Sequence, residues 1–116
     1  MVKRETIQRK ASPTAMLIGL PETLAAACAS ALIDGGLRVL RVGHVAAACE
    51  RIPVIMPQVV VVLAGIGRAE ADLLADGCVA VGAEVLRVAP ADDIAALGER
   101  LKDAANVALI RTLRSS

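Results

Sequence analysis

The stretch QVVVVLA, residues 58–64, decides the fold class of this 116-residue chain. Its four consecutive valines are β-branched, which favours a strand over a helix. The stretch lacks the alternation of apolar and polar residues that marks a half-exposed strand. Both faces of the strand must therefore be buried, as in a central strand of a parallel sheet that is covered by helices on both sides. The stretch predicts an α/β domain.

Apolar runs alternate with stretches of helical spacing on both sides of this strand. Pro21 suits the first turn of a helix, and Gly35-Gly36 suits its end. Pro53 and Pro57 flank a predicted loop, and Asp76-Gly77 is expected to interrupt the helix that follows the valine strand. The predicted strands are 14–20, 37–42, 58–64 and 84–88, and the predicted helices are 22–34, 45–51, 68–75 and 94–113.

This order of elements predicts a flavodoxin-like, doubly wound parallel sheet. Connections of about a dozen residues between parallel strands imply right-handed crossovers, with helices on both faces. We expect about four to five strands in the order 2-1-3-4, and residues 78–82 fit either a short strand or a last helical turn. Residues 1–13 are polar and aperiodic and predict a flexible tail. A single domain is expected over 14–116, with a helical extension over 104–116.

Composition excludes several classes of protein. The 13 Lys and Arg residues against 12 Asp and Glu give a net charge of +1, which attracts neither nucleic acid nor an anionic membrane. The apolar run 52–67 contains two prolines and is shorter than the roughly 20 residues that a membrane-spanning helix needs. Three cysteines without CxxC spacing predict free thiols and a cytoplasmic location. We expect no membrane contact and no direct nucleic-acid contact from this domain.

Two stretches resemble the receiver domain of bacterial response regulators. The first is LIGLPETLAAACASALIDGGLRVLRV, residues 17–42, and the second is VGAEVLRVAPADDIAALGERL, residues 81–101. The first resembles a receiver's opening strand, helix and second strand, and the second resembles its last strand, proline corner and last helix. Only about eighteen residues, 65–82, stand where a receiver has a helix, a strand and another helix. The resemblance implies a receiver-like domain that is shortened in this region.

The residues that a receiver uses for phosphoryl transfer are missing from the matching positions. A receiver holds Mg²⁺ with two acidic residues and an acceptor aspartate, and a lysine contacts the product. Here the acidic pair matches Gly19 and Leu20, the acceptor matches Leu63, and the lysine matches Ala89. None of these side chains carries an oxygen ligand or a charge. The resemblance therefore implies a degenerate phosphorylation pocket in a pseudo-receiver that is not an enzyme and uses no metal or cofactor.

The outward faces of the first and last helices are unusually apolar for surface helices. Contiguous apolar surface usually marks a protein interface. We therefore predict contact with a protein partner or assembly into a homo-oligomer. The candidate interface residues are Ala26, Ala29 and Ile33 in the first helix and Leu109, Ile110 and Leu113 in the last.

The turn Gly65-Ile66-Gly67 before a helix offers a weaker candidate site. Its backbone amides, together with Arg68, could bind an anion, although a plain tight turn explains the same residues. The turn lacks the third glycine of a dinucleotide-binding fingerprint. His44 is the only histidine, so no histidine-based metal site is expected, and we predict a surface position for it.

The leading hypothesis is a non-phosphorylatable, receiver-like interaction module in bacterial signal transduction or transcriptional regulation. Two alternatives remain open. One is a small flavodoxin-like protein or enzyme that binds a nucleotide or another cofactor. The other is the regulatory domain of a DNA-binding transcription factor.

Overall fold

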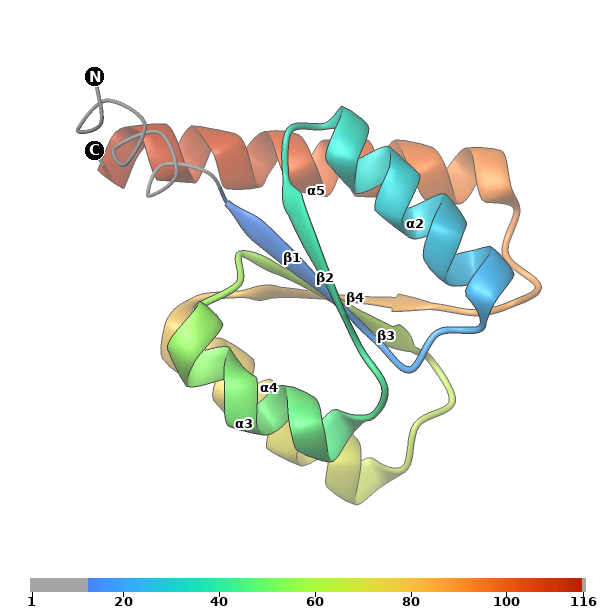
Figure 1. Ribbon diagram of the computed structural model, residues 1–116, viewed down its shortest axis with the longest axis vertical. Helices are drawn as coiled ribbons and strands as arrows, with labels where there is room; N and C mark the ends of the chain where they lie inside the picture. The colour runs from blue at the N-terminus through green and yellow to red at the C-terminus, as the bar shows by residue number, and fades with distance from the viewer. Residues whose placement is uncertain (1–12, 116) are drawn as a thin grey trace.

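The computed structural model describes residues 13–115 and shows one parallel sheet between two layers of helices (Figure 1). The sheet order is β2-β1-β3-β4, and strands and helices alternate along the chain. The predicted flavodoxin-like α/β fold is therefore confirmed, in its four-stranded form. The strands are β1 (Thr14–Ile18), β2 (Arg38–Val42), β3 (Val59–Leu63) and β4 (Glu84–Val88), and the helices are α2 (Glu22–Asp34), α3 (Val45–Ile55), α4 (Arg68–Val81) and α5 (Ile94–Ser115).

The valine strand β3 lies in the middle of the sheet, between β1 and β4. Residues 59–62 are each at most 1% exposed. Because successive side chains of a strand point to opposite faces, Val59 and Val61 enter the core under α2 and α5, whereas Val60 and Val62 enter the core under α3 and α4. Figure 1 shows these two helix pairs on opposite sides of the sheet. The prediction of a central strand buried on both faces is confirmed.

Small residues let α2 and α5 approach each other closely. A Cβ atom added at Gly35 would lie only 2.6 Å from the Cβ atom of Ala105. At Gly36, an added Cβ would lie 3.3 Å from a methyl carbon of Leu109, and the backbone φ of 95° also favours glycine there. A core without aromatic side chains gains its contacts from such close approaches, because each small side chain buries little area by itself.

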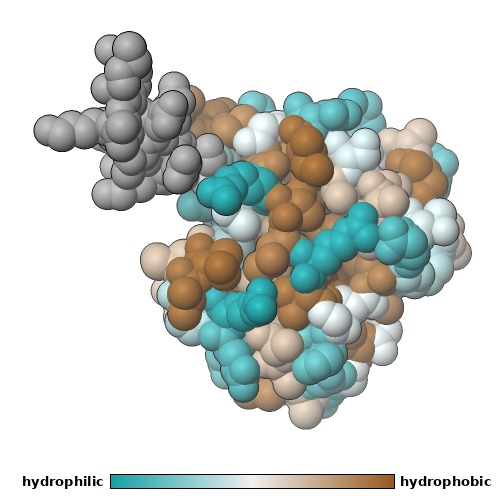
Figure 2. All heavy atoms as spheres, in the orientation of Figure 1, coloured by the Kyte–Doolittle hydropathy of each residue, from teal (hydrophilic) through white to brown (hydrophobic). Residues whose placement is uncertain are grey.

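Strand β2 forms one edge of the sheet, as predicted for residues 37–42. Arg38 and Arg41 are exposed on it, and charged side chains on an edge strand discourage pairing with other chains. Val39 and Leu40 are partly buried against the two core layers. Figure 2, which views this edge, shows hydrophobic surface across the middle of the molecule, crossed by strips of hydrophilic side chains.

Two helices are longer than the sequence predicts. Helix α3 continues past Arg51 to Ile55 and contains Pro53, although proline lacks the N–H group for a helical hydrogen bond. The fully buried Ile52 holds this last turn against the core. Helix α4 continues through Gly77, which faces Ile52 across the helix pair. Packing between α3 and α4 therefore outweighs the low helix propensity of glycine, which amounts to about 1 kcal/mol.

Residues 78–81 form the last turn of α4 and do not add a fifth strand. Cys78 is 1% exposed and belongs to the core under α3 and α4. Gly82 then ends the helix in the left-handed region, with a φ of 73°. The alternative of a short strand at 78–82 is therefore wrong, because burial of Cys78 extends the helix and the glycine terminates it.

The ends of the domain differ slightly from the predicted boundaries. Pro13, which the sequence assigns to the tail, is buried, and its carbonyl accepts a hydrogen bond from the Arg38 amide at 3.0 Å. Pro13 therefore belongs to the start of the sheet and not to the predicted tail. The rest of that tail, residues 1–12, lies outside the described residues. At the other end, α5 runs to Ser115 and takes in the predicted extension over 104–116, except for Ser116, which is also outside the described residues.

Glycine-to-alanine substitutions at two positions should have opposite effects on stability. Gly35→Ala should destabilise the protein by about 1–3 kcal/mol, because its Cβ would overlap Ala105. Gly98→Ala should stabilise it by up to about 1 kcal/mol, because nothing lies within 4 Å of the added Cβ and alanine favours a helix interior. Urea denaturation of both variants measures the difference. Equal stabilities would contradict the close approach of α2 and α5.

Candidate functional site

The carboxyl ends of the four parallel strands lie at one edge of the sheet, where doubly wound domains bind their ligands. Gly19 and Leu20 follow β1, Leu63 ends β3, and Ala89 follows β4. The structure thus places all four residues of the predicted degenerate pocket at this same edge. Leu20 and Leu63 are half-buried and pack against the core under α2 and α5. At these positions the edge presents aliphatic side chains and backbone.

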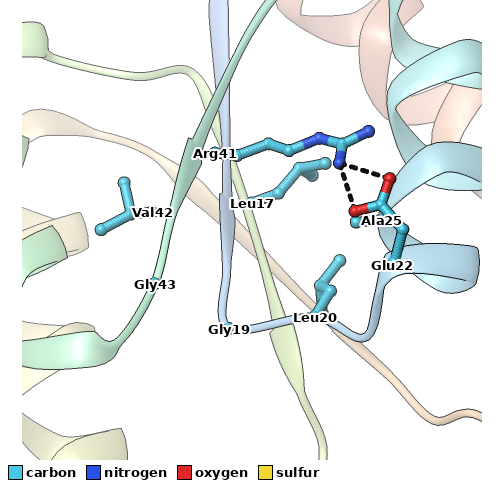
Figure 3. A pocket seen from close by; sticks show the side chains of 8 residues that line it. All are labelled: Leu17, Gly19, Leu20, Glu22, Ala25, Arg41, Val42 and Gly43. Atoms are coloured by element: carbon cyan, nitrogen blue, oxygen red, sulfur yellow. Dashed lines mark hydrogen bonds and ion pairs between the residues drawn. The ribbon is translucent and has the colours of Figure 1, made fainter.

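A cleft of about 310 Å³ opens at this edge beside β1 and β2 (Figure 3). Its main polar feature is an ion pair, in which Nη1 of Arg41 lies 2.9 Å and 3.1 Å from the two carboxylate oxygens of Glu22. Figure 3 shows the two side chains pointing toward one another from β2 and α2. Both are exposed, so the pair contributes at most about 1 kcal/mol to stability. The cleft is lined by Leu17, Gly19, Leu20, Glu22, Ala25, Arg41, Val42 and Gly43.

The sequence does not reveal the partnership of Glu22 and Arg41, which stand nineteen residues apart. Arg41 alternates with apolar residues on an edge strand, and the sequence pattern alone is satisfied by a side chain that points into solvent. The available signal is topological. Glu22 opens the helix after one strand and Arg41 stands near the end of the neighbouring strand, so a parallel arrangement brings both to one edge. The ion pair therefore engages Glu22, the acidic residue that follows Leu20 by two positions.

Asp92 is a second carboxylate at the carboxyl edge, and it too is engaged. Its Oδ2 accepts a hydrogen bond from the Ala89 amide at 2.8 Å, while its own amide donates to the Ala89 carbonyl at 3.0 Å. Burial and the negative charge of Asp92 both raise the pKa of the Cys28 thiol, burial being the larger cause. Asp93 caps α5 by accepting a hydrogen bond from the Ala96 amide. Asp92 therefore closes the turn that follows β4.

The turn at Gly65, Gly67 and Arg68 brings its three predicted residues together, and a carboxylate oxygen of Glu70 lies near Gly67. All three are exposed. Gly67 precedes α4 with an ordinary φ of −62°, and an added Cβ at Gly65 would meet nothing within 4 Å. Ile66 between the glycines packs against the core under α3 and α4. This geometry favours a structural turn anchored by Ile66 over an anion site.

His44 occupies the predicted surface position at the start of α3. Its Nδ1 atom accepts a hydrogen bond from the Ala47 amide at 3.3 Å, so the imidazole caps the helix. Within residues 13–115, no three His, Cys, Asp or Glu side chains are grouped as metal ligands would be.

The candidate interface is partly rearranged by the packing of α2 against α5. Ile33, Ile110 and Leu113 are 57%, 43% and 71% exposed, and Ala26 is exposed as well. Ala29 is only 8% exposed, because it belongs to the core that α2 shares with α5. Leu109 is half-buried against the same core, where it contacts Gly36. The prediction that these last two residues face outward is therefore wrong.

Val107, which is not among the predicted interface residues, is 44% exposed on α5. It precedes Ile110 by three residues, and Ile110 precedes Leu113 by three, which is the spacing of neighbours on a helix surface. We call these three residues the outer face of α5. This three-residue spacing is the sequence signal that identifies Val107 as part of the surface.

No protein-family model matches the chain, and no curated protein matches it significantly. Across the described part of the chain, none of the helices combines the length and the apolar character needed to span a bilayer. We infer a function from the carboxyl edge of the sheet and from the outer face of α5.

The three thiols should differ in reactivity. Cys28 and Cys78 are buried and Cys49 is half-buried, so a maleimide should label Cys49 first in the native protein. Burial raises the pKa of all three thiols, so labelling should be slower than for an unfolded chain. Mass spectrometry of tryptic peptides identifies the labelled residue. A Cys49→Ala variant should lose the fast reaction, and rapid labelling of Cys78 would contradict the described core.

Alkaline pH should lower stability partly through Cys78. Burial, with a smaller effect of nearby Cys49, raises its pKa from 9.0 to about 11. The unfolded chain releases this proton first, so the stabilising contribution is complete below pH 9 and is lost as pH rises toward 11. Urea denaturation at several pH values measures the slope. Cys78→Ala should flatten the slope in this window, and an unchanged slope would contradict the assignment.

Proposed function

We propose that this protein is a receiver-like protein–protein interaction module in bacterial signal transduction or transcriptional regulation, and that it works without phosphoryl transfer. The observation that carries the proposal is the outer face of α5, on which Val107, Ile110 and Leu113 are 44%, 43% and 71% exposed. The apolar carboxyl edge of the sheet supports the second part of the proposal.

The length of α5 supports a role in binding. Each strand has five residues and spans about 17 Å, whereas the 22 residues of α5 span about 33 Å. The last fully buried residue of α5 is Ala108, and Leu109 still packs against the core, so only the helix beyond Leu109 is not required to cover the sheet. Each Å² of exposed apolar surface that a partner covers contributes about 25 cal/mol of favourable free energy to binding. A helix that extends its apolar surface beyond the core is suited to hold a partner.

The carboxylates at the carboxyl edge support a role without phosphoryl transfer. Transfer to a receiver requires an acceptor carboxylate and oxygen ligands that hold Mg²⁺ beside it. Glu22 is paired with Arg41, and Asp92 is bonded to the Ala89 amide. The aliphatic side chains of Leu20 and Leu63 stand at the ends of β1 and β3 and pack against the core.

The chain should not respond to phosphoryl donors. Incubation with Mg²⁺ and acetyl phosphate should leave its mass unchanged, and Mg²⁺ with beryllofluoride should leave its melting temperature unchanged. A phosphorylatable receiver treated in parallel shows that the reagents are active. Stoichiometric modification of this chain, or a clear rise in its melting temperature, would overturn the proposal.

Partner binding should depend on the outer face of α5. Ile110→Glu should weaken capture of a partner from a lysate of the source organism at least tenfold, because charge replaces apolar contact at an interface. Leu73→Glu is the matched control, since Leu73 is 61% exposed on α4. Both variants should keep their stability within about 0.5 kcal/mol, as exposed positions usually do. Equal capture by the two variants would contradict the assigned surface.

A further inference from the structure

Four residues of α5 form a stripe with a regular order of chemistry. Asp103, Val107, Ile110 and Arg114 follow one another at intervals of four, three and four, which places them along one side of the helix. All four are exposed. Along the helix the stripe is therefore acidic, apolar, apolar and basic.

A two-fold axis makes this order complementary to itself. When two identical helices pack antiparallel, equal steps in opposite directions lead from one facing pair to the next. Asp103 stands four residues before Val107, and the partner's Arg114 stands four residues after the partner's Ile110. When Val107 faces the partner's Ile110, Asp103 therefore faces the partner's Arg114. The same pairs occur twice, because a two-fold interface repeats each contact.

We infer that the partner bound by α5 is a second copy of this chain, packed antiparallel through this stripe. The inference rests on the proposed function, because it names the occupant of the interaction surface. Within the described residues, neither Asp103 nor Arg114 has a hydrogen-bond or ion-pair partner, so both charges are available to the second copy. The dimer joins each carboxylate to a guanidinium and covers Val107 and Ile110.

The charge order also disfavours the parallel, in-register arrangement. In a parallel pair Asp103 would face the partner's Asp103, and Arg114 would face the partner's Arg114. Like charges at facing positions disfavour such an interface, and complementary charges fix its orientation more than they raise its affinity. The stripe spans about 16 Å of helix. A contact of this length buries an area at the small end of the range for specific interfaces. The expected dimer is therefore weak and depends on protein concentration.

Reversal of the charges tests the pairing in the full chain. Sedimentation equilibrium over a wide range of concentration should show a dimer. Asp103→Arg and Arg114→Asp should each weaken it about tenfold, because each turns two attractive pairs into two repulsive ones. The double variant Asp103→Arg/Arg114→Asp restores opposite charges in reverse and should return the affinity to near its original value. Leu73→Glu, on α4, should leave the dimer unchanged.

Cross-linking tests the register independently. In a Cys49→Ala background, chains with Val107→Cys and chains with Ile110→Cys are mixed, and oxidised glutathione accepts the two electrons as two thiols form a disulfide. The mixture should give more covalent dimer than either chain alone. A parallel dimer would instead cross-link each chain with itself and would overturn the inference.

The outcomes separate this inference from the proposed function. A chain that stays monomeric at every concentration, or a double variant as weak as the single ones, overturns the self-pairing. The proposed function would still stand in that case if Ile110→Glu alone lost a captured partner of another sequence. A response to Mg²⁺ and beryllofluoride would overturn the proposed function and leave the oligomeric state to be judged by sedimentation.

Discussion

The whole architecture depends on covering both faces of β3 at the same time. A strand whose valines are fully buried on both sides requires a layer of helices above and another below, and it requires parallel neighbours whose crossovers supply those helices. Because the chain contains no aromatic residue, the layers must come close to the sheet and to one another. The contact between Gly35 and Ala105 shows how close they come. Larger side chains at this point would separate α2 from α5 and open the core.

This constraint also determines what is left for function. The side chains that fill the sheet and the inner faces of the helices are committed to packing, and the carboxylates at the carboxyl edge are committed to Arg41 and to the Ala89 amide. Within the described part of the chain, the three side chains of the outer face of α5 are not used for packing, because they are 44%, 43% and 71% exposed. Binding through the surface of a helix is therefore compatible with the fold.

The sequence predicts those parts of the fold that local signals determine. The valine run fixes the central strand, and Gly35 and Gly36 fix the end of α2. The ends of α3 and α4 are not predictable in this way, because Pro53 and Gly77 are helix breakers that packing around Ile52 overrides. Residues at the candidate site follow the same rule. The position of Gly19, Leu20, Leu63 and Ala89 at the carboxyl edge is predictable, because each stands at or next to the end of a predicted strand. The burial of Ala29 and the pairing of Glu22 with Arg41 depend instead on how distant elements meet.

The aromatic-free core has a spectroscopic consequence. Without Trp, Tyr or Phe, the chain has no side chain that absorbs strongly or fluoresces in the near ultraviolet. Any such signal in a purified sample therefore comes from another molecule, whether a partner protein, a nucleotide or a flavin. A single tryptophan placed on the surface would report its local environment without background from the rest of the fold. A core packed without aromatic rings thus leaves the protein without near-ultraviolet absorbance of its own. Binding can be observed directly through the light that the bound molecule absorbs.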